Sequence, residues 1–255
     1  MIKRYTKQQH QTLREGGKIL ARCLDVVKES VKEGVSTLEL DKIAREFIKS
    51  KGAVPSFRGY QGYRYSICVS INNESIHGVP SDNKVLKDGD IVSIDIGVRH
   101  NGLCTDAART FAVGNVSAEA QQLIDASRES FYQGILGLKA GERVGSIGER
   151  IEDYIKKNTD YSIIESYCGH GVGKKIHEDP LVPNFRPSVG KLAGYVDQTL
   201  PDGCVLAIEP MINQGVKDIK LAEDGWTVLT ADGKLAAHWE NTVIVTKDGV
   251  EIITV

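Results

Sequence analysis

The two halves of this chain repeat one another, and this repeat limits the possible folds more than any other feature. Residues 86–95 (LKDGDIVSID) align with residues 200–209 (LPDGCVLAIE), so that leucine, aspartate, glycine and isoleucine recur in register. Each copy ends in a carboxylate, Asp95 or Glu209. HGVP at 77–80 is similar to HGVG at 170–173. The repeat predicts two copies of one supersecondary unit.

The spacing of apolar residues predicts the same order of elements in each half. Helical periodicity favours a helix over 9–34, and a capping box formed by Ser36 and Glu39 opens a second one that ends at Gly52. Strand-like sequence then runs to about residue 113. A helix opening at Ser117 and closing at Gly141, an amphipathic stretch over 147–155 and further strands follow. We expect an α+β fold in a single domain, 1–255, with halves of about 1–115 and 116–255.

Composition excludes several classes of protein. Of the 255 residues, 41% are hydrophobic and 26% charged, as in an ordinary globular chain, and the net charge is −2. We therefore expect no nucleic-acid and no membrane partner. The start, MIKRYTKQQHQTLREGG, lacks the apolar core of a secretory signal, and five widely spaced cysteines do not suggest disulfides. The expected location is cytoplasmic.

Two acidic residues of the first half are predicted to share one face of a hairpin. Asn101 and Gly102 form a strong two-residue turn signal, which places Asp95 opposite Ala108. Asp106 lies two residues from Ala108, so its Cα should be roughly 7–8 Å from that of Asp95. Arg109 should point to the opposite face.

The second half supplies two more acids in apolar surroundings, Glu209 and Glu240. If the repeat is also spatial, all four carboxylates meet at one centre. A shared proton, a basic side chain or cations would have to offset their repulsion, and two divalent ions would neutralise all four. The alternative is four unrelated surface or edge acids.

The six histidines differ in their settings. His170 lies between two glycines, which allow a ligand to approach closely, and beside four acids it is expected to be a fifth metal ligand. His177 follows seven residues later. His10 and His100 lie in a polar helix start and a turn and are expected to be solvated, while no role is assigned to His238.

Several strings together resemble the type I methionine aminopeptidases over about residues 8–250. They are SINNESIHGVP (70–80), DIGVRHNGLCTDAARTF (95–111), YCGHGVGKKIHEDP (167–180), AIEPMI (207–212) and DGWTVLTADGKLAAHWENT (224–242). The resemblance implies a pita-bread fold, in which helices pack on a curved antiparallel sheet with pseudo-twofold symmetry. It also implies removal of the initiator methionine from nascent proteins and peptides with a small second residue.

The resemblance further implies a dinuclear centre of two divalent ions, Mn, Fe, Co or Zn. Its five ligands would be Asp95, Asp106, His170, Glu209 and Glu240. By this analogy Asp95 chelates one ion, Asp106 and Glu240 bridge both, and His170 and Glu209 complete the second site. A bridging hydroxide would be the nucleophile and Glu209 would shuttle its proton. His77 and His177 would hold the substrate amide and stabilise the developing oxyanion.

The family's methionine pocket maps onto Tyr60, Tyr63, Cys68, Trp226, Phe57 and Ile176. Phe57 and Ile176 stand where many relatives have cysteine and phenylalanine, and Asn241 stands where histidine commonly follows the last glutamate. Alternatively, Trp226 pairs with Trp239 across a turn at 232–233. The stretch from 180 to 201 is long enough to be a surface flap.

Implied partners are the N-termini of nascent polypeptides and peptides, with ribosome contact as a further expectation, and the chain is expected to be a monomer. Three other functions stay open at this point. They are a proline-directed peptidase of the same fold, a binding module that has lost its metals, and a cysteine amidase. Cleavage of an X-Pro peptide, metal content and a Cys–His–acid arrangement would distinguish them.

Overall fold

The computed structural model describes residues 1–187 and 192–255. Its helices are α1 (Lys7–Glu29), α2 (Thr37–Ser50), α3 (Ala118–Ile135) and α4 (Gly145–Asn158), with a 3-10 turn at Tyr60–Gly62. The first-half strands are β1 (Val54–Pro55), β2 (Ile67–Ile71), β3 (Glu74–Ile76), β4 (Ile91–His100) and β5 (Leu103–Ala112). The second-half strands are β6 (Ser162–Ile163), β7 (Gly169–Gly171), β8 (Glu178–Val182), β9 (Cys204–Ile208), β10 (Met211–Asn213), β11 (Ile219–Leu221), β12 (Val228–Thr230), β13 (Ala236–His238), β14 (Asn241–Val245) and β15 (Val250–Ile252). The predicted order of helices followed by strands, repeated once, is confirmed.

Side-chain caps fix where the helices begin. The Ser36 hydroxyl accepts the Glu39 backbone N–H while the Glu39 carboxylate accepts the Ser36 N–H, which is the predicted capping box of α2. Ser117 caps α3 as predicted, but the helix ends at Ile135 rather than at Gly141, because Leu136 has an extended backbone conformation. The predicted end of α1 is wrong, because the helix stops at Glu29 rather than at Gly34. Ser30 donates its N–H to Val27 O, three residues back, and this tight turn ends the helical ladder.

The strands form antiparallel sheets whose two largest members correspond to the two halves. In the first half, β4 pairs with β5 on one side and with β1 and β2 on the other. In the second half the order is β15-β14-β9-β7-β8. Each half therefore contains an antiparallel strand pair, β4–β5 or β9–β14, with two acids within the strands or directly at their ends, which is the spatial repeat predicted from the sequence.

The two halves join along β5 and β14. The Thr242 hydroxyl donates to Asp106 O and accepts from Asp106 N, both at 2.8 Å. The Glu240 N–H donates to Ala108 O at 2.9 Å. These bonds bring residues more than 130 positions apart in the sequence into register, and they fix Asp106 and Glu240 beside one another.

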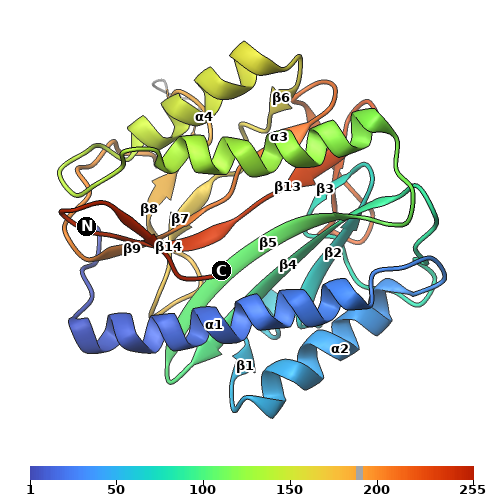
Figure 1. The fold of residues 1–255 in the computed structure, drawn as a ribbon, viewed down its shortest axis with the longest axis horizontal. Coiled ribbons are helices and arrows are strands. Elements are labelled where there is room, and N and C mark those ends of the chain that lie inside the picture. The colour runs from blue at the N-terminus through green and yellow to red at the C-terminus, as the bar shows by residue number, and fades with distance from the viewer. Residues whose placement is uncertain (188–191) are drawn as a thin grey trace.

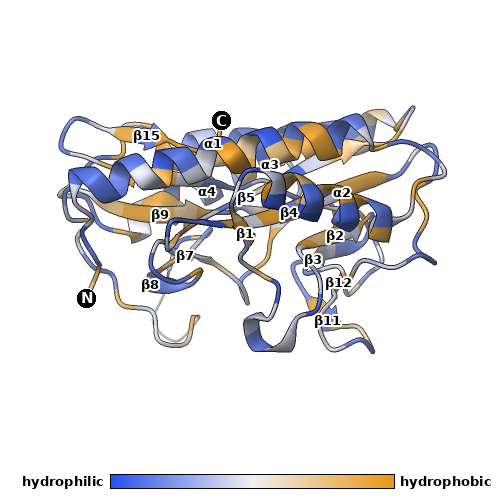
Figure 2. Ribbon diagram, turned by 90° about the horizontal axis from the view of Figure 1, so that it is seen from below, coloured by the Kyte–Doolittle hydropathy of each residue, from blue (hydrophilic) through white to orange (hydrophobic). Residues whose placement is uncertain are grey.

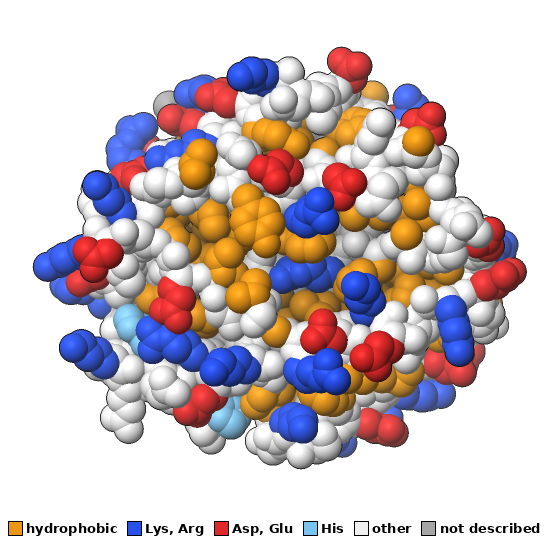
Figure 3. All heavy atoms as spheres, in the orientation of Figure 1, with side chains coloured by type: hydrophobic (Ala, Val, Ile, Leu, Met, Phe, Trp, Pro, Cys, Tyr) orange, Lys and Arg blue, Asp and Glu red, His pale blue; other side chains and the backbone are white. Residues whose placement is uncertain are grey.

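The four helices cover one face of the strand layer (Figure 1). Seen from the side, they lie above the strands, whereas β3, β7, β8, β11 and β12 lie toward the opposite face (Figure 2). Each half has its own apolar core between helices and sheet: Leu24 and Ile94 belong to the first, Leu123 and Leu206 to the second. On the helical face, acidic and basic side chains are interspersed around an apolar strip (Figure 3). No helix in the described ranges is long and apolar enough to span a membrane.

The predicted pairing of Trp226 with Trp239 is wrong. β12 pairs with β11 and β3, whereas β13 pairs with β10, so the two segments diverge after the turn at 232–233. Trp226 instead packs against Tyr63, with 5.0 Å between ring centroids. Trp239 lies under the Arg109 guanidinium at 4.4 Å. β12 pairs instead with β3, which is far away in the sequence, so the local turn signal at 232–233 could not predict this partner.

The stretch from 180 to 201, predicted to be a surface flap, is described except for 188–191, which lie outside the described residues. Its first residues belong to β8, and Leu192 and Ala193 line the cavity described below. All five cysteines are unpaired thiols, four buried and Cys168 partly buried, in agreement with the sequence expectation.

Candidate metal centre

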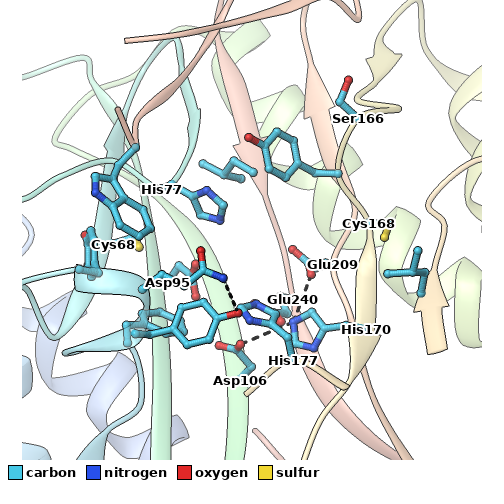
Figure 4. Close-up of a pocket in the computed structure, with 18 of the residues that line it drawn as sticks. Cys68, His77, Asp95, Asp106, Ser166, Cys168, His170, His177, Glu209 and Glu240 are labelled. Carbon is cyan, nitrogen blue, oxygen red and sulfur yellow. Dashed lines mark hydrogen bonds and ion pairs between the residues drawn. The ribbon is translucent and has the colours of Figure 1, made fainter. Parts of the chain in front are cut away.

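All four predicted acids line one cavity of about 520 Å³ on the face opposite the helices. Asp95 comes from the middle of β4 and Asp106 from β5, while Glu209 directly follows β9 and Glu240 directly precedes β14. The hairpin register is the predicted one, with Asp95 opposite Ala108. Figure 4 shows these carboxylates and the His170 ring directed toward one another.

His170 enters this cluster from β7, and its flanking glycines make that approach possible. A Cβ at Gly169 would lie 2.4 Å from Ala207 O, and one at Gly171 would lie 2.0 Å from Asp179 O. Only glycine therefore lets β7 fit between β8 and β9. His170 Nε2 lies 3.6 Å from Glu209 Oε1 and 3.8 Å from Asp106 Oδ2.

A further histidine, His238, also reaches the cluster, and the sequence analysis missed it. Its Nε2 lies 3.4 Å from Glu209 Oε2, and the residue is 2% exposed. A signal was present in the sequence: in extended chain, His238 shares a face with Glu240, two residues later. The prediction that His10 and His100 are solvated is wrong, since both are partly buried. His10 bonds to Gly203 O, and His100 lies 3.5 Å from Glu15.

Burial makes the charged forms of these groups unfavourable. Desolvation raises the pKa of Asp95 to about 7 and that of Glu209 to about 8. Desolvation and then the neighbouring carboxylates raise the pKa values of Asp106 and Glu240 well above the usual range. Burial also lowers the pKa of His170 to about 3, so this imidazole is neutral and does not offset the acids.

Arg109 offsets the acids only slightly, because its side chain lies on the opposite face of β5, as predicted. The guanidinium donates to the backbone oxygens of Glu240 and Thr254 and to Asn241 Oδ1. It also contacts the ring of Trp239, which does not line the cavity. Arg109 therefore supports the backbone beside the acids, while burial and the other carboxylates raise the pKa of Glu240 more than the Arg109 charge lowers it.

The donor set fits divalent cations. Asp95 Oδ1, Asp106 Oδ1 and Glu240 Oε1 are buried and have no hydrogen-bond partner. Two sets of three ligand atoms each lie within 4.8 Å of one another, Asp106–His170–Glu240 and Glu209–His238–Glu240, and Glu240 belongs to both. Carboxylate oxygens with imidazole nitrogen suit Mn, Fe, Co or Zn. Cations would satisfy the unpartnered oxygens and neutralise the acids.

The two remaining predicted histidines stand at the side of the cavity. His77 follows β3 with a positive φ of 58°, and its ring meets Tyr167 edge-on at 5.5 Å. The ring centroid of His177 lies 4.4 Å from that of His170 and 5.0 Å from that of Tyr60. Burial lowers the pKa of both imidazoles, to about 4 in His77. Both are therefore neutral hydrogen-bonding groups beside the acids.

An apolar recess completes the cavity. Five of the six residues predicted for a methionine pocket line it: Phe57, Tyr60, Tyr63, Cys68 and Trp226. Ile176 is buried in the same apolar cluster but is not among the residues that line the cavity. The acidic cluster, which could bind cations, lies beside an apolar recess and two neutral imidazoles. This arrangement can support metal-assisted hydrolysis of a substrate with an apolar side chain.

Comparison with known proteins agrees with this chemistry. Residues 11–247 match the profile of metallopeptidase family M24. The sequence is 51% identical over 243 residues to a methionine aminopeptidase from Clostridium perfringens, covering 95% of this chain and 94% of that protein. The fold is similar to the crystal structure of methionine aminopeptidase from Rickettsia prowazekii, with a TM-score of 0.94, 39% identity and complete coverage of both chains.

A proline-directed relative is less similar. An Xaa-Pro dipeptidase from Bacillus anthracis has 26% identity and a TM-score of 0.77, and this chain covers 61% of its length. The full-length match to the Rickettsia structure confirms the predicted α+β pita-bread fold.

Proposed function

The chain belongs to metallopeptidase family M24 and, within it, to the methionine aminopeptidases, and on that premise we propose that it removes the initiator methionine from nascent proteins and peptides with a small second residue. The observation that supports this most strongly is one cavity that joins four buried acids and His170 to an apolar recess. The repulsion among the buried acids favours the binding of cations, and the recess can accommodate one unbranched apolar side chain.

In this proposal two divalent ions, Mn, Fe, Co or Zn, are held by Asp95, Asp106, His170, Glu209 and Glu240. The ions would supply Lewis-acid polarisation of the scissile carbonyl and would lower the pKa of the attacking water. When ionised, the four carboxylates carry a net charge of about −4, which two divalent ions would balance.

The surrounding side chains hold the substrate and move its protons. Glu209 takes the proton of the attacking water and returns it to the leaving amine, since its carboxylate faces the cavity. His77 and His177 are neutral, so each can donate one N–H to the substrate amide oxygen. The methionine thioether packs among the aromatic edges of Tyr60, Tyr63 and Trp226.

The proposal extends to the whole protein. Residues 1–255 act as one catalytic domain, because acids from both halves, about 1–115 and 116–255, build the same centre. We place the enzyme in the cytoplasm as a monomer that meets chain N-termini near the ribosome, with neither nucleic acid nor membrane as a partner.

The deciding experiment measures metal content and peptide turnover together. The metal-free chain would be reconstituted with Mn²⁺, Co²⁺, Fe²⁺ or Zn²⁺ and given Met-Ala-Ser, Met-Leu-Ser and an Ala-Pro peptide. We expect two ions per chain and cleavage of Met-Ala-Ser in preference to the others. Cleavage of the Ala-Pro peptide alone would show a proline-directed peptidase, and the absence of bound metal would leave only a binding module.

A further inference from the structure

The His238 ring lies beside Glu209 and belongs to one of the two sets of clustered ligand atoms, but it is not among the five residues proposed to hold the ions. We propose that His238 is a positioning residue: its Nε2–H donates to Glu209 Oε2 and fixes the orientation of that carboxylate. The inference rests on the proposed function, since it assigns a partner to the residue that moves the proton.

The geometry assigns the two oxygens of Glu209 to different neighbours. Oε1 lies 3.6 Å from His170 Nε2 and Oε2 lies 3.4 Å from His238 Nε2. Glu209 lines the cavity, whereas His238 is not among its lining residues. The carboxylate is therefore held between one imidazole within the cavity and one outside it.

The nitrogen involved makes no hydrogen bond within the described residues, and although Asp95 also interacts electrostatically with this ring, the Glu209 oxygen lies within 3.4 Å of the nitrogen. His238 is 2% exposed, and its Nε2 is buried without any hydrogen bond in the part of the chain that the structure describes. A buried polar atom left unpaired is costly, and a small rotation of Glu209 would satisfy it. A hydrogen bond from outside the cavity would leave Oε1 directed toward the ligand cluster.

The backbone of His238 is fixed from two strands, which sets the position from which its side chain approaches Glu209. Its N–H donates to Thr110 Oγ1 and its carbonyl accepts from the same hydroxyl, both at 2.9 Å. Thr110 is itself bonded to Ser93 on β4 at 2.8 Å, and Met211 pairs with His238 across β10 and β13. Residues that orient metal ligands in this way typically change metal affinity or activity by about 10- to 100-fold when replaced.

Three substitutions separate this role from others. The amide nitrogen of His238→Gln reaches as far as Nε2, that of His238→Asn falls short at the position of Nδ1, and His238→Leu has no donor. Mn²⁺ binding to the metal-free chain would be measured by calorimetry, and kcat and KM with Met-Ala-Ser. We expect Asn and Leu to weaken Mn²⁺ affinity and kcat on the order of 10-fold or more with KM little changed, and Gln to restore both.

His100→Leu is the matched control, because His100 also faces a carboxylate at 3.5 Å, but that carboxylate, Glu15, does not line the cavity as Glu209 does. Thermal unfolding of the metal-free variants would check the fold, and the polar Asn and Gln variants keep the test valid if Leu does not fold. Wild-type metal affinity in the Asn and Leu variants would overturn the proposal.

Equal loss in the Gln variant, with one imidazole fewer around Co²⁺ by X-ray absorption, would overturn it too, because His238 would then be a ligand. An inactive wild type would contradict the proposed function instead, and the Mn²⁺ affinities would still decide the role of His238.

Discussion

At the residue scale, buried acids whose carboxylate accepts hydrogen bonds differ from buried acids whose carboxylate has an oxygen without a partner. Asp41 is buried, but its Oδ1 accepts the N–H groups of Ser66 at 2.6 Å and Ile67 at 3.1 Å. Asp106 is equally buried, and its Oδ1 has no partner. The first carboxylate stabilises a loop, whereas the second destabilises the metal-free fold.

Substitutions at these two residues should therefore have opposite effects. Asp106→Asn should raise the melting temperature of the metal-free chain at pH 8, because the folded state no longer has to protonate or bury a carboxylate there, while it abolishes metal binding and turnover. Asp41→Ala should lower the free energy of unfolding by about 1–3 kcal/mol, because two backbone N–H groups lose their acceptor, and it should leave metal stoichiometry intact. Calorimetric melting and metal analysis would measure both, and a destabilised apo Asp106→Asn chain would contradict the account.

His177 offers a second test at this scale. Its ring contacts Tyr60 and the His170 ring and lies outside both sets of clustered ligand atoms. His177→Ala should therefore fold and keep its metal content while turnover of Met-Ala-Ser falls by about 10²-fold or more, as for a lost oxyanion donor. Loss of metal from this variant would mean that His177 is itself a ligand.

At the element scale, close backbone approaches decide which positions must be glycine. Gly16 and Gly17 are neighbours in α1, yet a Cβ at Gly17 would lie 2.0 Å from Ile253 O, while one at Gly16 would lie 3.4 Å from its nearest neighbour, His100 Cβ. The chain end after β15 thus packs directly on the α1 backbone at Gly17.

Alanine at these two positions should separate packing from helix propensity. Gly17→Ala should lower the free energy of unfolding by about 1–3 kcal/mol, because the C-terminal segment must move away. Gly16→Ala should keep the wild-type value or gain up to about 1 kcal/mol from helix propensity. Urea unfolding of both variants would measure the difference, and equal stabilities would show that the chain end does not pack as described.

At the scale of the whole molecule, the buried acids predict an unusual dependence of apo stability on pH. Above about pH 7.5 the histidines are neutral in both states, because their pKa is 6.5 in the unfolded chain and folding lowers it to about 4 in His77 and His238. The buried acids still hold protons in the folded state, since the pKa of Asp95 rises to about 7, that of Glu209 to about 8, and those of Asp106 and Glu240 well above the usual range. The folded state therefore binds more protons, and its stability should fall as pH rises from about 7.5 to about 8.5.

Urea unfolding with a chelator at pH 7.5, 8 and 8.5 would test this. The decline should be shallower in Glu209→Gln, which removes one titrating group. Metal should reverse the trend, since ligands must be deprotonated to bind it and binding to the folded chain adds stability. A flat apo profile would mean that the acids are ionised without cations.

The sequence by itself determined the elements and the residues that meet within one half. Ser36, Glu39 and Ser117 specify helix starts through bonds to nearby backbone, and Asn101-Gly102 fixes the β4–β5 register that places Asp95 near Asp106. These interactions join residues close in sequence, so local chemistry is sufficient to predict them.

Only the tertiary structure decided what joins the halves. The Thr242 bonds to Asp106, the departure of β12 toward β3, and the place of His238 behind Glu209 all depend on contacts between distant segments. Such contacts form when the edge or face of a sheet packs against a segment that is distant in the sequence. The identity of that segment depends on the whole fold, so a local sequence pattern does not predict it. The repeat predicted that the acids converge, but only the packing of the two sheets decided which histidines reach them.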